Sequence, residues 1–419
     1  MTSTFIIFYY YVIYNSKTEF ERSNFHVPTF QRIVTSRTLR TLSFSDLDEI
    51  LRAAQCTIVS GLSNSLFDSY ILSESSLFIY PLKIIIKTCG TTQLLKSIPP
   101  LLHHASKLSL TVRQCRYSRG TFLFPAVQPF PHRNFNEEVK FLDHHFAHLG
   151  SKAYLMGTES QKINWHVYSA VAEEEDSNPS PTAYTLEVCM TELDRDLAAH
   201  FYKRPGNETT NEMTVSTGIN TLLPNSQICD FAFEPCGYSM NSIESNGYST
   251  IHVTPEEGYS YASFEVMGYD PRTLDLQDLL SRVAGTFNPS TLSFSIYTND
   301  SREKCGQDPL NSWVVSALPS GYECETTSHQ ELHAGGVVVF HTFSKKATTS
   351  SPHSAKAPLP IFPMEEIAQT QSSNKSIKDS INKSYRKCSC GLDVAATRTL
   401  QADAIPSAAA PAIDMGRRY

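Results

Sequence analysis

A series of short strand-like runs between Leu39 and Lys345 constrains the fold more than any other feature of the sequence. Runs such as KIIIKTC, NWHVYSAVA and STIHVTP are rich in β-branched and aromatic residues, and turn-rich links separate them. Helical patterns are fewer, as in SFSDLDEILRAA, whose expected N-cap is Ser45, and FNEEVKFLDHHFAHLG, which should end at Gly150. These patterns predict an α+β fold, with helices packed outside antiparallel sheets, rather than a doubly wound fold.

Composition narrows the classes of partner. Of the 419 residues, 41% are hydrophobic and 11% aromatic, which is enough for a large β-rich core. The formal net charge of -7 indicates no basic surface, so we expect no nucleic-acid partner. The ten cysteines are widely spaced and include no CxxC pair, a pattern typical of reduced thiols in a cytoplasmic protein.

The two ends of the chain differ from the middle. The apolar run FIIFYYYVIY, from Phe5 to Tyr14, is too short to span a bilayer and lacks the flanking features of a signal peptide. We therefore expect a strand there and no membrane segment. Residues 346–419 are rich in Ser, Ala, Lys and Pro, and this composition predicts a disordered low-complexity tail.

One hairpin carries an unusual polar insertion. The stretch YILSESSLFIY places Ser73, Glu74, Ser75 and Ser76 between two apolar runs that should be buried strands. Taken alone, the insertion is best explained as a turn of hydroxyl-bearing residues.

Six separated motifs change that interpretation, because together they resemble eukaryotic S-adenosylmethionine decarboxylase, most closely its plant form. The motifs are LSESSLF (Leu72 to Phe78), KTCGTT (Lys87 to Thr92), FPHRNFNEEV (Phe130 to Val139), TLEVCMTELD (Thr185 to Asp194), FEPCGYSMN (Phe233 to Asn241) and STIHVTPEEGYSYASFE (Ser249 to Glu265). They occur in the family's order and assign residues 39–345 to the catalytic domain, after a divergent segment 1–38. The resemblance implies a four-layer α/β/β/α sandwich of two antiparallel sheets.

The resemblance also implies a pyruvoyl-dependent lyase that is made as a zymogen. Such an enzyme decarboxylates S-adenosylmethionine through a Schiff base and supplies the aminopropyl donor for spermidine and spermine biosynthesis. Decarboxylation leaves a carbanion, so the reaction needs an electron sink that no side chain offers. The chain would make one by autocatalytic cleavage between Glu74 and Ser75. The fragment ending at Glu74 would remain as a small subunit, in a monomer or a dimer.

The family assigns processing roles to particular residues of this chain. The hydroxyl of Ser75 attacks the carbonyl of Glu74, and elimination then converts residue 75 into the pyruvoyl group. His252 is the implied base for that elimination, and Ser239 hydrogen-bonds the processing intermediate. Without the flanking motifs, His252 would more often be a core or surface histidine, and Ser239 a turn serine beside Gly237.

Other implied roles concern the substrate. Cys89 protonates the substrate carbon after carbon dioxide leaves, although a buried inert cysteine is the usual alternative. The backbone of Leu72 contacts the adenine, Phe233 stacks on it, and Glu256 holds the ribose hydroxyls. Cys236 has a weaker claim to a role.

A further set of positions matches the charged network that binds putrescine in the animal enzyme. Glu187 and Glu265 keep its carboxylates, whereas Ala183 replaces an acidic residue, so we expect no strong activation by diamines. We expect no metal site either, because the histidines of DHHFAHLG, from Asp143 onwards, are explained as a helix surface.

The sequence departs from the family at its start. The family opens with a strand resembling GFEGYEKRLEI, whose phenylalanine completes the adenine sandwich and whose two glutamates face the site. Counting back from Leu39, those positions fall near Tyr14, Asn15 and Thr18, and the glutamates have no counterpart. An active decarboxylase is one hypothesis, and a catalytically impaired or regulatory paralogue is the other. A non-enzymatic α+β binding domain would leave the motif series unexplained.

Overall fold

The computed structural model describes residues 4–12, 38–73, 75–158, 161–172, 184–203, 210–269, 274–298, 321–333 and 335–346. Of residues 4–12 it describes the backbone. Several predictions fall outside these ranges: the cleavage-site residue Glu74, the substituted position Ala183, and the predicted tail after residue 346. All described residues belong to one compact unit, Met1–Leu359.

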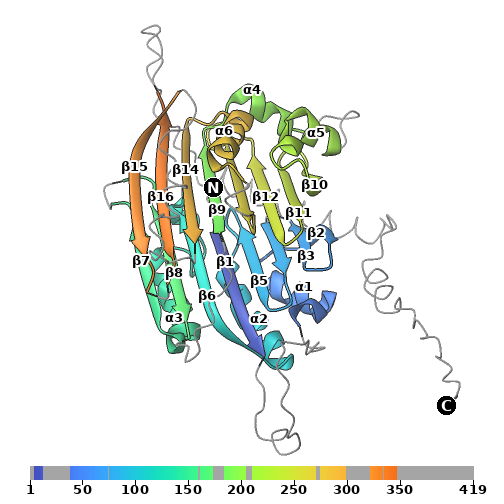
Figure 1. Ribbon diagram of the computed structural model, residues 1–419, viewed down its shortest axis with the longest axis vertical. Coiled ribbons are helices and arrows are strands. Elements are labelled where there is room, and N and C mark those ends of the chain that lie inside the picture. The colour runs from blue at the N-terminus through green and yellow to red at the C-terminus, as the bar shows by residue number, and fades with distance from the viewer. Residues whose placement is uncertain are drawn as a thin grey trace, which may run out of the picture. The chain divides into compact units, whose positions relative to one another are not determined.

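Two eight-stranded antiparallel sheets form the centre of the molecule (Figure 1). In hydrogen-bonded order, the first sheet contains β2 (Ile58–Ser63), β3 (Asp68–Leu72), β4 (Ser75–Ile79), β5 (Lys83–Thr88), β1 (Thr4–Val12), β6 (Leu110–Gly120), β8 (Trp165–Val171) and β7 (Ser151–Met156). The second contains β10 (Gln227–Ala232), β11 (Tyr238–Glu244), β12 (Gly247–Thr254), β13 (Tyr261–Met267), β9 (Tyr184–Thr191), β14 (Thr291–Thr298), β16 (Val337–Lys345) and β15 (Tyr322–Glu331). The second order repeats the first with eight added to each strand number, so the two halves share one topology.

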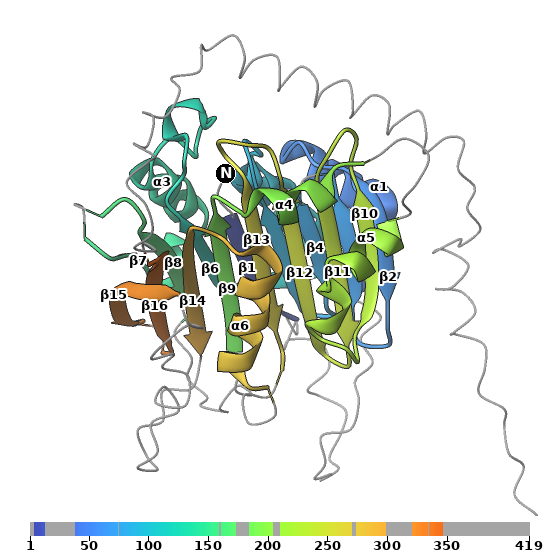
Figure 2. The ribbon, with the colours of Figure 1, turned by 90° about the horizontal axis from the view of Figure 1, so that it is seen from above.

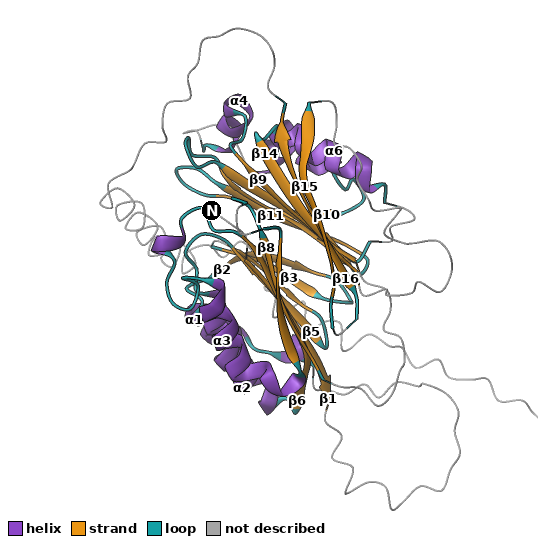
Figure 3. Cartoon of the chain, turned by 90° about the vertical axis from the view of Figure 1, so that its left-hand side faces the viewer, coloured by secondary structure: helices purple, strands orange, loops and turns teal. Residues whose placement is uncertain are grey.

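Helices cover the outer faces of the stacked sheets, as Figures 2 and 3 show. The first sheet carries α1 (Phe44–Ala53), α2 (Ile98–Lys107) and α3 (Phe135–Phe146), and the second carries α4 (Arg195–Ala198), α5 (Thr210–Ser216) and α6 (Leu276–Phe287). Short 3-10 turns lie at Leu39–Thr41, Leu94–Ser97, Pro125–Val127, Ala147–Leu149, Ala199–Phe201 and Ile219–Thr221. The predicted α+β sandwich with outer helices is confirmed.

Local sequence explains most helix ends. The prolines of α2 stand in its first turn, where a missing N–H costs nothing. After α3 a 3-10 turn ends at Gly150, whose φ of 70° favours glycine. The predicted N-cap Ser45 is wrong, because the N-cap of α1 is Ser43, two residues earlier. Ser43 forms a capping box with Asp46.

The strand predicted near the N-terminus is confirmed as β1, which lies between β5 and β6 in the middle of the first sheet. Its sequence, TFIIFYYYV, contains no carboxylate. Within the described ranges, no helix is long and apolar enough to cross a membrane.

The layer between the sheets differs in character from the two outer layers. Large apolar clusters fill the spaces between each sheet and its helices. Between the sheets, smaller apolar clusters around Phe78 and Trp165 accompany a group of buried polar residues. That group is Ser76, Lys87, Arg116, Ser118, Thr185, Glu187, Ser239, Asn241, Thr250, His252 and Glu265. Burying polar groups costs free energy unless each finds a partner, so a polar middle layer marks the candidate site.

Candidate active site

The predicted cofactor precursor, Ser75, is the first residue of β4 and is fully buried. It pairs with Leu72 on β3 and with Thr88 on β5. Its hydroxyl lies 3.6 Å from the sulfur of Cys56, on the face of the sheet that the helices cover. The peptide segment is therefore held on both sides at the position where cleavage is predicted.

Successive residues of a strand point to opposite faces, so Ser76 projects between the sheets. Its Oγ lies 2.9 Å from Nε2 of His252, 2.9 Å from Oγ1 of Thr250 and 2.6 Å from Oδ1 of Asn241. The hydroxyl that contacts the predicted base from the cleavage hairpin thus belongs to Ser76.

The structure brings Ser239 and His252 together. They are directly paired residues on β11 and β12, and Ser239 Oγ lies 2.8 Å from Nδ1 of His252. Burial, together with the positive charge of Lys87, lowers the pKa of His252 to about 3. The imidazole is therefore neutral at physiological pH, which is the state in which it can accept a proton.

A buried charged network adjoins these residues. Lys87, which pairs with Ser76 in the sheet, donates from Nζ to Glu265 across the sandwich at 2.7 Å, and both side chains are at most 1% exposed. Burial lowers the pKa of Lys87, but the attraction of Glu265 and Glu187 outweighs it and raises the pKa. This pair ties β5 of one sheet to β13 of the other.

Glu187 completes the network. Its Oε1 accepts from Ser118 at 3.1 Å, and its Oε2 has no hydrogen-bond partner among the described residues. Burial and the neighbouring Glu265 raise the pKa of Glu187 to about 7, against the opposing effect of Lys87 and Arg116. The guanidinium of Arg116 lies 3.5 Å over the ring of Tyr297. The network therefore contains two cations, Lys87 and Arg116, and two carboxylates, Glu187 and Glu265.

Two of the predicted substrate residues, Phe233 and Glu256, lie in loops at one end of the sandwich. Phe233 is half-buried in the turn between β10 and β11, where its ring makes an edge contact with Phe231 at 4.8 Å. Glu256 lies in the loop between β12 and β13. Burial and Glu256 raise the pKa of Cys236 to about 12, so these two loops meet. β11 begins where β12 ends, which brings the loops close to Ser239 and His252.

Leu72 and Cys89 border the cleavage hairpin. Leu72 is fully buried at the end of β3, opposite Ser75. Cys89 directly follows Thr88, the β5 partner of Ser75, and precedes Gly90, whose φ is 70°. Cys89 is therefore one residue beyond the position that faces the predicted pyruvoyl precursor.

Sequence reasoning missed five residues of this site, namely Ser76, Lys87, Arg116, Asn241 and Thr250. Four of them lie inside or next to the quoted motifs, and Arg116 lies in the alternating strand QCRYSRG. A lysine next to an apolar run of a strand, as in KIIIKT, signals a buried ion pair, and that pattern could have identified Lys87.

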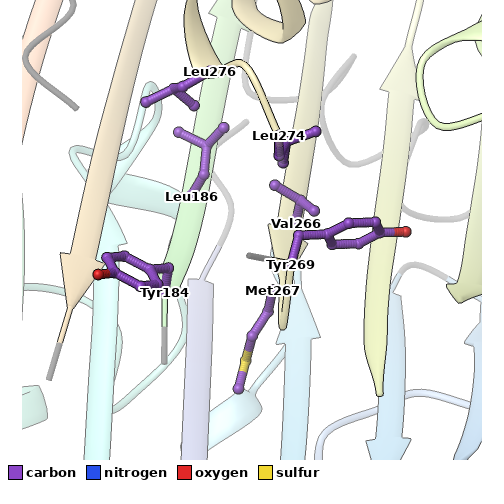
Figure 4. Close-up of a pocket in the computed structure, with 7 residues that line it drawn as sticks. All are labelled: Tyr184, Leu186, Val266, Met267, Tyr269, Leu274 and Leu276. Carbon is purple, nitrogen blue, oxygen red and sulfur yellow. The ribbon is translucent and has the colours of Figure 1, made fainter. Parts of the chain in front are cut away.

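A separate hollow lies on the outer face of the second sheet, beneath the start of α6 (Figure 4). It is lined by Tyr184, Leu186, Val266, Met267, Tyr269, Leu274 and Leu276. Its lining is apolar apart from two tyrosine hydroxyls, so it offers no group for acid–base chemistry. Among the described residues, no three His, Cys, Asp or Glu side chains are grouped to hold a metal ion.

Several known proteins are similar to this chain. The family model described as adenosylmethionine decarboxylase matches residues 18–344. The S-adenosylmethionine decarboxylase proenzyme of Vicia faba is 51% identical over 320 residues, covering 76% of this chain and 88% of the relative. S-adenosylmethionine decarboxylase proenzyme 1 of Arabidopsis thaliana is 53% identical over 310 residues, covering 73% of this chain and 82% of the relative. The crystal structure of the Trypanosoma brucei AdoMetDC-delta26 monomer aligns with a TM-score of 0.49 and 24% identity, over 65% of this chain and 99% of that one.

Proposed function

Because the chain belongs to the adenosylmethionine decarboxylase family, we propose that it cleaves itself before Ser75 and then decarboxylates S-adenosylmethionine. The observation that carries the proposal is the buried group formed by Ser239, His252 and the first residues of β4. Polar residues placed between two sheets cost stability, and a processing site gives a reason to keep them.

In the proposed processing, the Oγ of Ser75 attacks the carbonyl carbon of Glu74 and displaces its amide nitrogen, which takes up a proton. The ester then loses the Cα proton of residue 75 to His252, and the carboxylate of Glu74 leaves. Water adds to the resulting dehydroalanine and ammonia departs, so residue 75 becomes a pyruvoyl group. The burial of Ser75 and the neutral state of His252 suit these steps.

A pyruvoyl group supplies an electrophilic carbonyl that takes up the electrons released by decarboxylation. The chain's own residues bind and orient the substrate around it. Phe233 offers an aromatic face to the adenine, and Glu256 offers a carboxylate to the ribose hydroxyls. Cys89 holds the proton for the substrate carbon, and its position beside Thr88 agrees with that role.

The charged network supports turnover without a diamine activator. A diamine would balance excess negative charge between the sheets, but here Lys87 and Arg116 already accompany Glu187 and Glu265. We therefore propose that putrescine leaves the rate nearly unchanged. A large increase in turnover on adding putrescine would contradict this proposal.

Self-cleavage provides the direct test. The purified full-length chain should separate on a denaturing gel into residues 1–74 and 75–419, and mass spectrometry should find a pyruvoyl-blocked start on the larger fragment. Ser75→Ala should stay full length, while Ser73→Ala, two residues earlier in the same hairpin, should still be cleaved. A full-length band from the unaltered chain would instead support the impaired-paralogue hypothesis, which the absence of carboxylates in β1 motivates.

A second assay tests the chemistry. Cleaved protein should release labelled carbon dioxide from carboxyl-labelled S-adenosylmethionine, and the Ser75→Ala chain should release none. Cleavage without any release of carbon dioxide would refute the proposed activity while leaving the processing step intact.

A further inference from the structure

The imidazole of His252 is held at both of its nitrogens by hydroxyl groups. Ser239 Oγ lies 2.8 Å from Nδ1, while Ser76 Oγ and Thr250 Oγ1 lie 2.9 and 3.1 Å from Nε2. A neutral imidazole carries one N–H and one lone pair, and its partners decide which nitrogen has which. Burial keeps this ring neutral by lowering its pKa to about 3. A hydroxyl can either donate or accept, so the ring's immediate neighbours leave the tautomer open.

Asn241 removes that ambiguity. Its Nδ2 lies 3.0 Å from the backbone oxygen of Tyr70 and 3.1 Å from Oγ of Ser69. A backbone carbonyl can only accept, so the NH2 end of the amide must face Tyr70, and the oxygen end must face Ser76. That oxygen, Oδ1, lies 2.6 Å from Ser76 Oγ. An amide oxygen can only accept, so Ser76 donates to it.

A hydroxyl has one proton, and the proton of Ser76 is committed to Asn241. Ser76 can therefore only accept at its contact with His252, and the 2.9 Å contact is a hydrogen bond only when Nε2 carries the proton. Thr250 agrees with this assignment, because its hydroxyl can donate to the second lone pair of Ser76 at 2.9 Å.

We propose that Asn241 is a positioning residue that fixes His252 as its Nε2–H tautomer. The basic lone pair then lies on Nδ1 and faces the hydroxyl of Ser239, which donates to it. Asn241 acts on His252 through the hydroxyl of Ser76. Its consequence for cleavage rests on the proposed function of His252, whereas the tautomer itself does not.

Loss of the amide oxygen should release the Ser76 proton. In Asn241→Leu, Ser76 can donate to Nε2, and the imidazole proton can move to Nδ1. Ser239 would then face an N–H instead of a base. In Asn241→Asp, an oxygen still accepts from Ser76 whether or not the new carboxyl is protonated, so the Nε2–H tautomer should be kept.

Nuclear magnetic resonance tests the tautomer directly. Chains carrying Ser75→Ala, which cannot be cleaved by the proposed route, would be labelled with nitrogen-15 histidine. Two-bond proton–nitrogen correlations distinguish protonated from unprotonated ring nitrogens, and the His252 signals are those lost in His252→Gln. We expect Nε2–H in the Ser75→Ala parent and in Asn241→Asp, and a shift towards Nδ1–H in Asn241→Leu.

The control is Ser242→Ala. Ser242 follows Asn241 by one residue, is fully buried, and contacts Ser249 at 2.7 Å on the opposite face of the same two strands. It should leave the His252 signals unchanged. An Nδ1–H tautomer in the parent would overturn the proposal even if Asn241→Leu failed to fold. An unaltered tautomer in folded Asn241→Leu would overturn it as well.

Cleavage rates in chains that retain Ser75 give the second readout. Losing the residue that orients a metal-bound histidine typically costs about tenfold to a hundredfold, and we expect Asn241→Leu to slow cleavage by a similar factor. Asn241→Asp should restore much of the rate. If the parent itself is never cleaved, the proposed function fails while the tautomer measurement stands.

Discussion

Replacing Lys87 by Met should destabilise the protein strongly, because it leaves buried carboxylates without their nearest cation. Lys87 and Glu265 are 1% and 0% exposed and lie 2.7 Å apart. Breaking a buried pair by removing one partner typically costs about 3–5 kcal/mol, since the remaining charge stays out of water. Glu187 adds a second carboxylate to the same space, so the loss should fall within this range rather than below it.

This free energy converts into a measurable shift of the melting temperature. An unfolding entropy of about 2.1 cal/mol/K per residue gives roughly 0.7 kcal/mol/K for a domain that spans residues 18–344. The expected fall is therefore about 4–7 °C. Circular dichroism melts of Ser75→Ala chains at about pH 8 would measure it, with every protein a single uncleaved chain.

Three further variants show whether the cause is the buried charge. Glu265→Gln alone and Glu265→Gln combined with Lys87→Met complete a double-mutant cycle. The combined change removes both partners and should recover most of the loss, with a coupling of about 2 kcal/mol or more. Arg52→Met removes an ion pair that is 75% and 50% exposed, and should change stability by at most about 0.5 kcal/mol. The reasoning is refuted if Lys87→Met melts within about 1 °C of the parent, or if the two single changes simply add.

Three other outcomes follow from the site. Because the pKa of Glu187 is raised from 4.5 to about 7, the folded state binds the proton of this carboxyl more tightly than the unfolded state does. Protonation of Glu187 should favour folding by about 3 kcal/mol below pH 4.5, and that contribution should disappear as the pH rises to about 7. Denaturant titrations across this range would detect the trend, and Glu187→Gln should abolish it. Glu256→Gln should raise KM for S-adenosylmethionine by about tenfold with little change in self-cleavage, whereas Glu257→Gln, 70% exposed in the same loop, should leave KM unchanged. Cys89→Ser should lower kcat and spare substrate binding, and an unchanged kcat would remove Cys89 from the proposed chemistry.

The strands and the fold class could be predicted from sequence because they depend on local composition. Helix starts were harder to place, and α1 shows why. Ser43 with Asp46, and Ser45 with Asp48, both satisfy the pattern of a cap followed three residues later by an acidic side chain. The structure uses the earlier pair. The prediction took the later of the two, because the pattern itself does not distinguish them.

The duplicated topology could not be predicted in the same way. The two sheets share one strand order, yet the sequence has no repeat of useful period. Strand order depends on pairings between distant segments, such as β1 with β5 and β6, and alternating apolar residues do not record which partner a strand will choose.

The motifs of the resemblance pointed to part of the candidate site. Residues whose partners lie on the opposite sheet were missed. Ser239 and His252 could be assigned from the resemblance, and they are directly paired. Ser76 received no role, because its contact with His252 depends on which face of β4 turns towards the second sheet. Asn241 and Lys87 were missed for the same reason, since their partners come from the opposite sheet. Such contacts follow from sheet packing and not from spacing along the chain.

The strand order also bears on how the protein would survive its own cleavage. A cut between residues 74 and 75 would leave β1, β2 and β3 on the smaller fragment and β4 onwards on the larger one. In the sheet these strands are interleaved: β3 pairs with β4, and β1 pairs with both β5 and β6. The smaller fragment could leave only by breaking three strand pairings at once, in the middle of a covered sheet. The cut instead opens a tight hairpin whose two strands stay paired, so the new first residue keeps its place between β3 and β5 and opposite the second sheet. The interleaving of strands from both fragments therefore lets the chain be cut within the first sheet and retain both pieces.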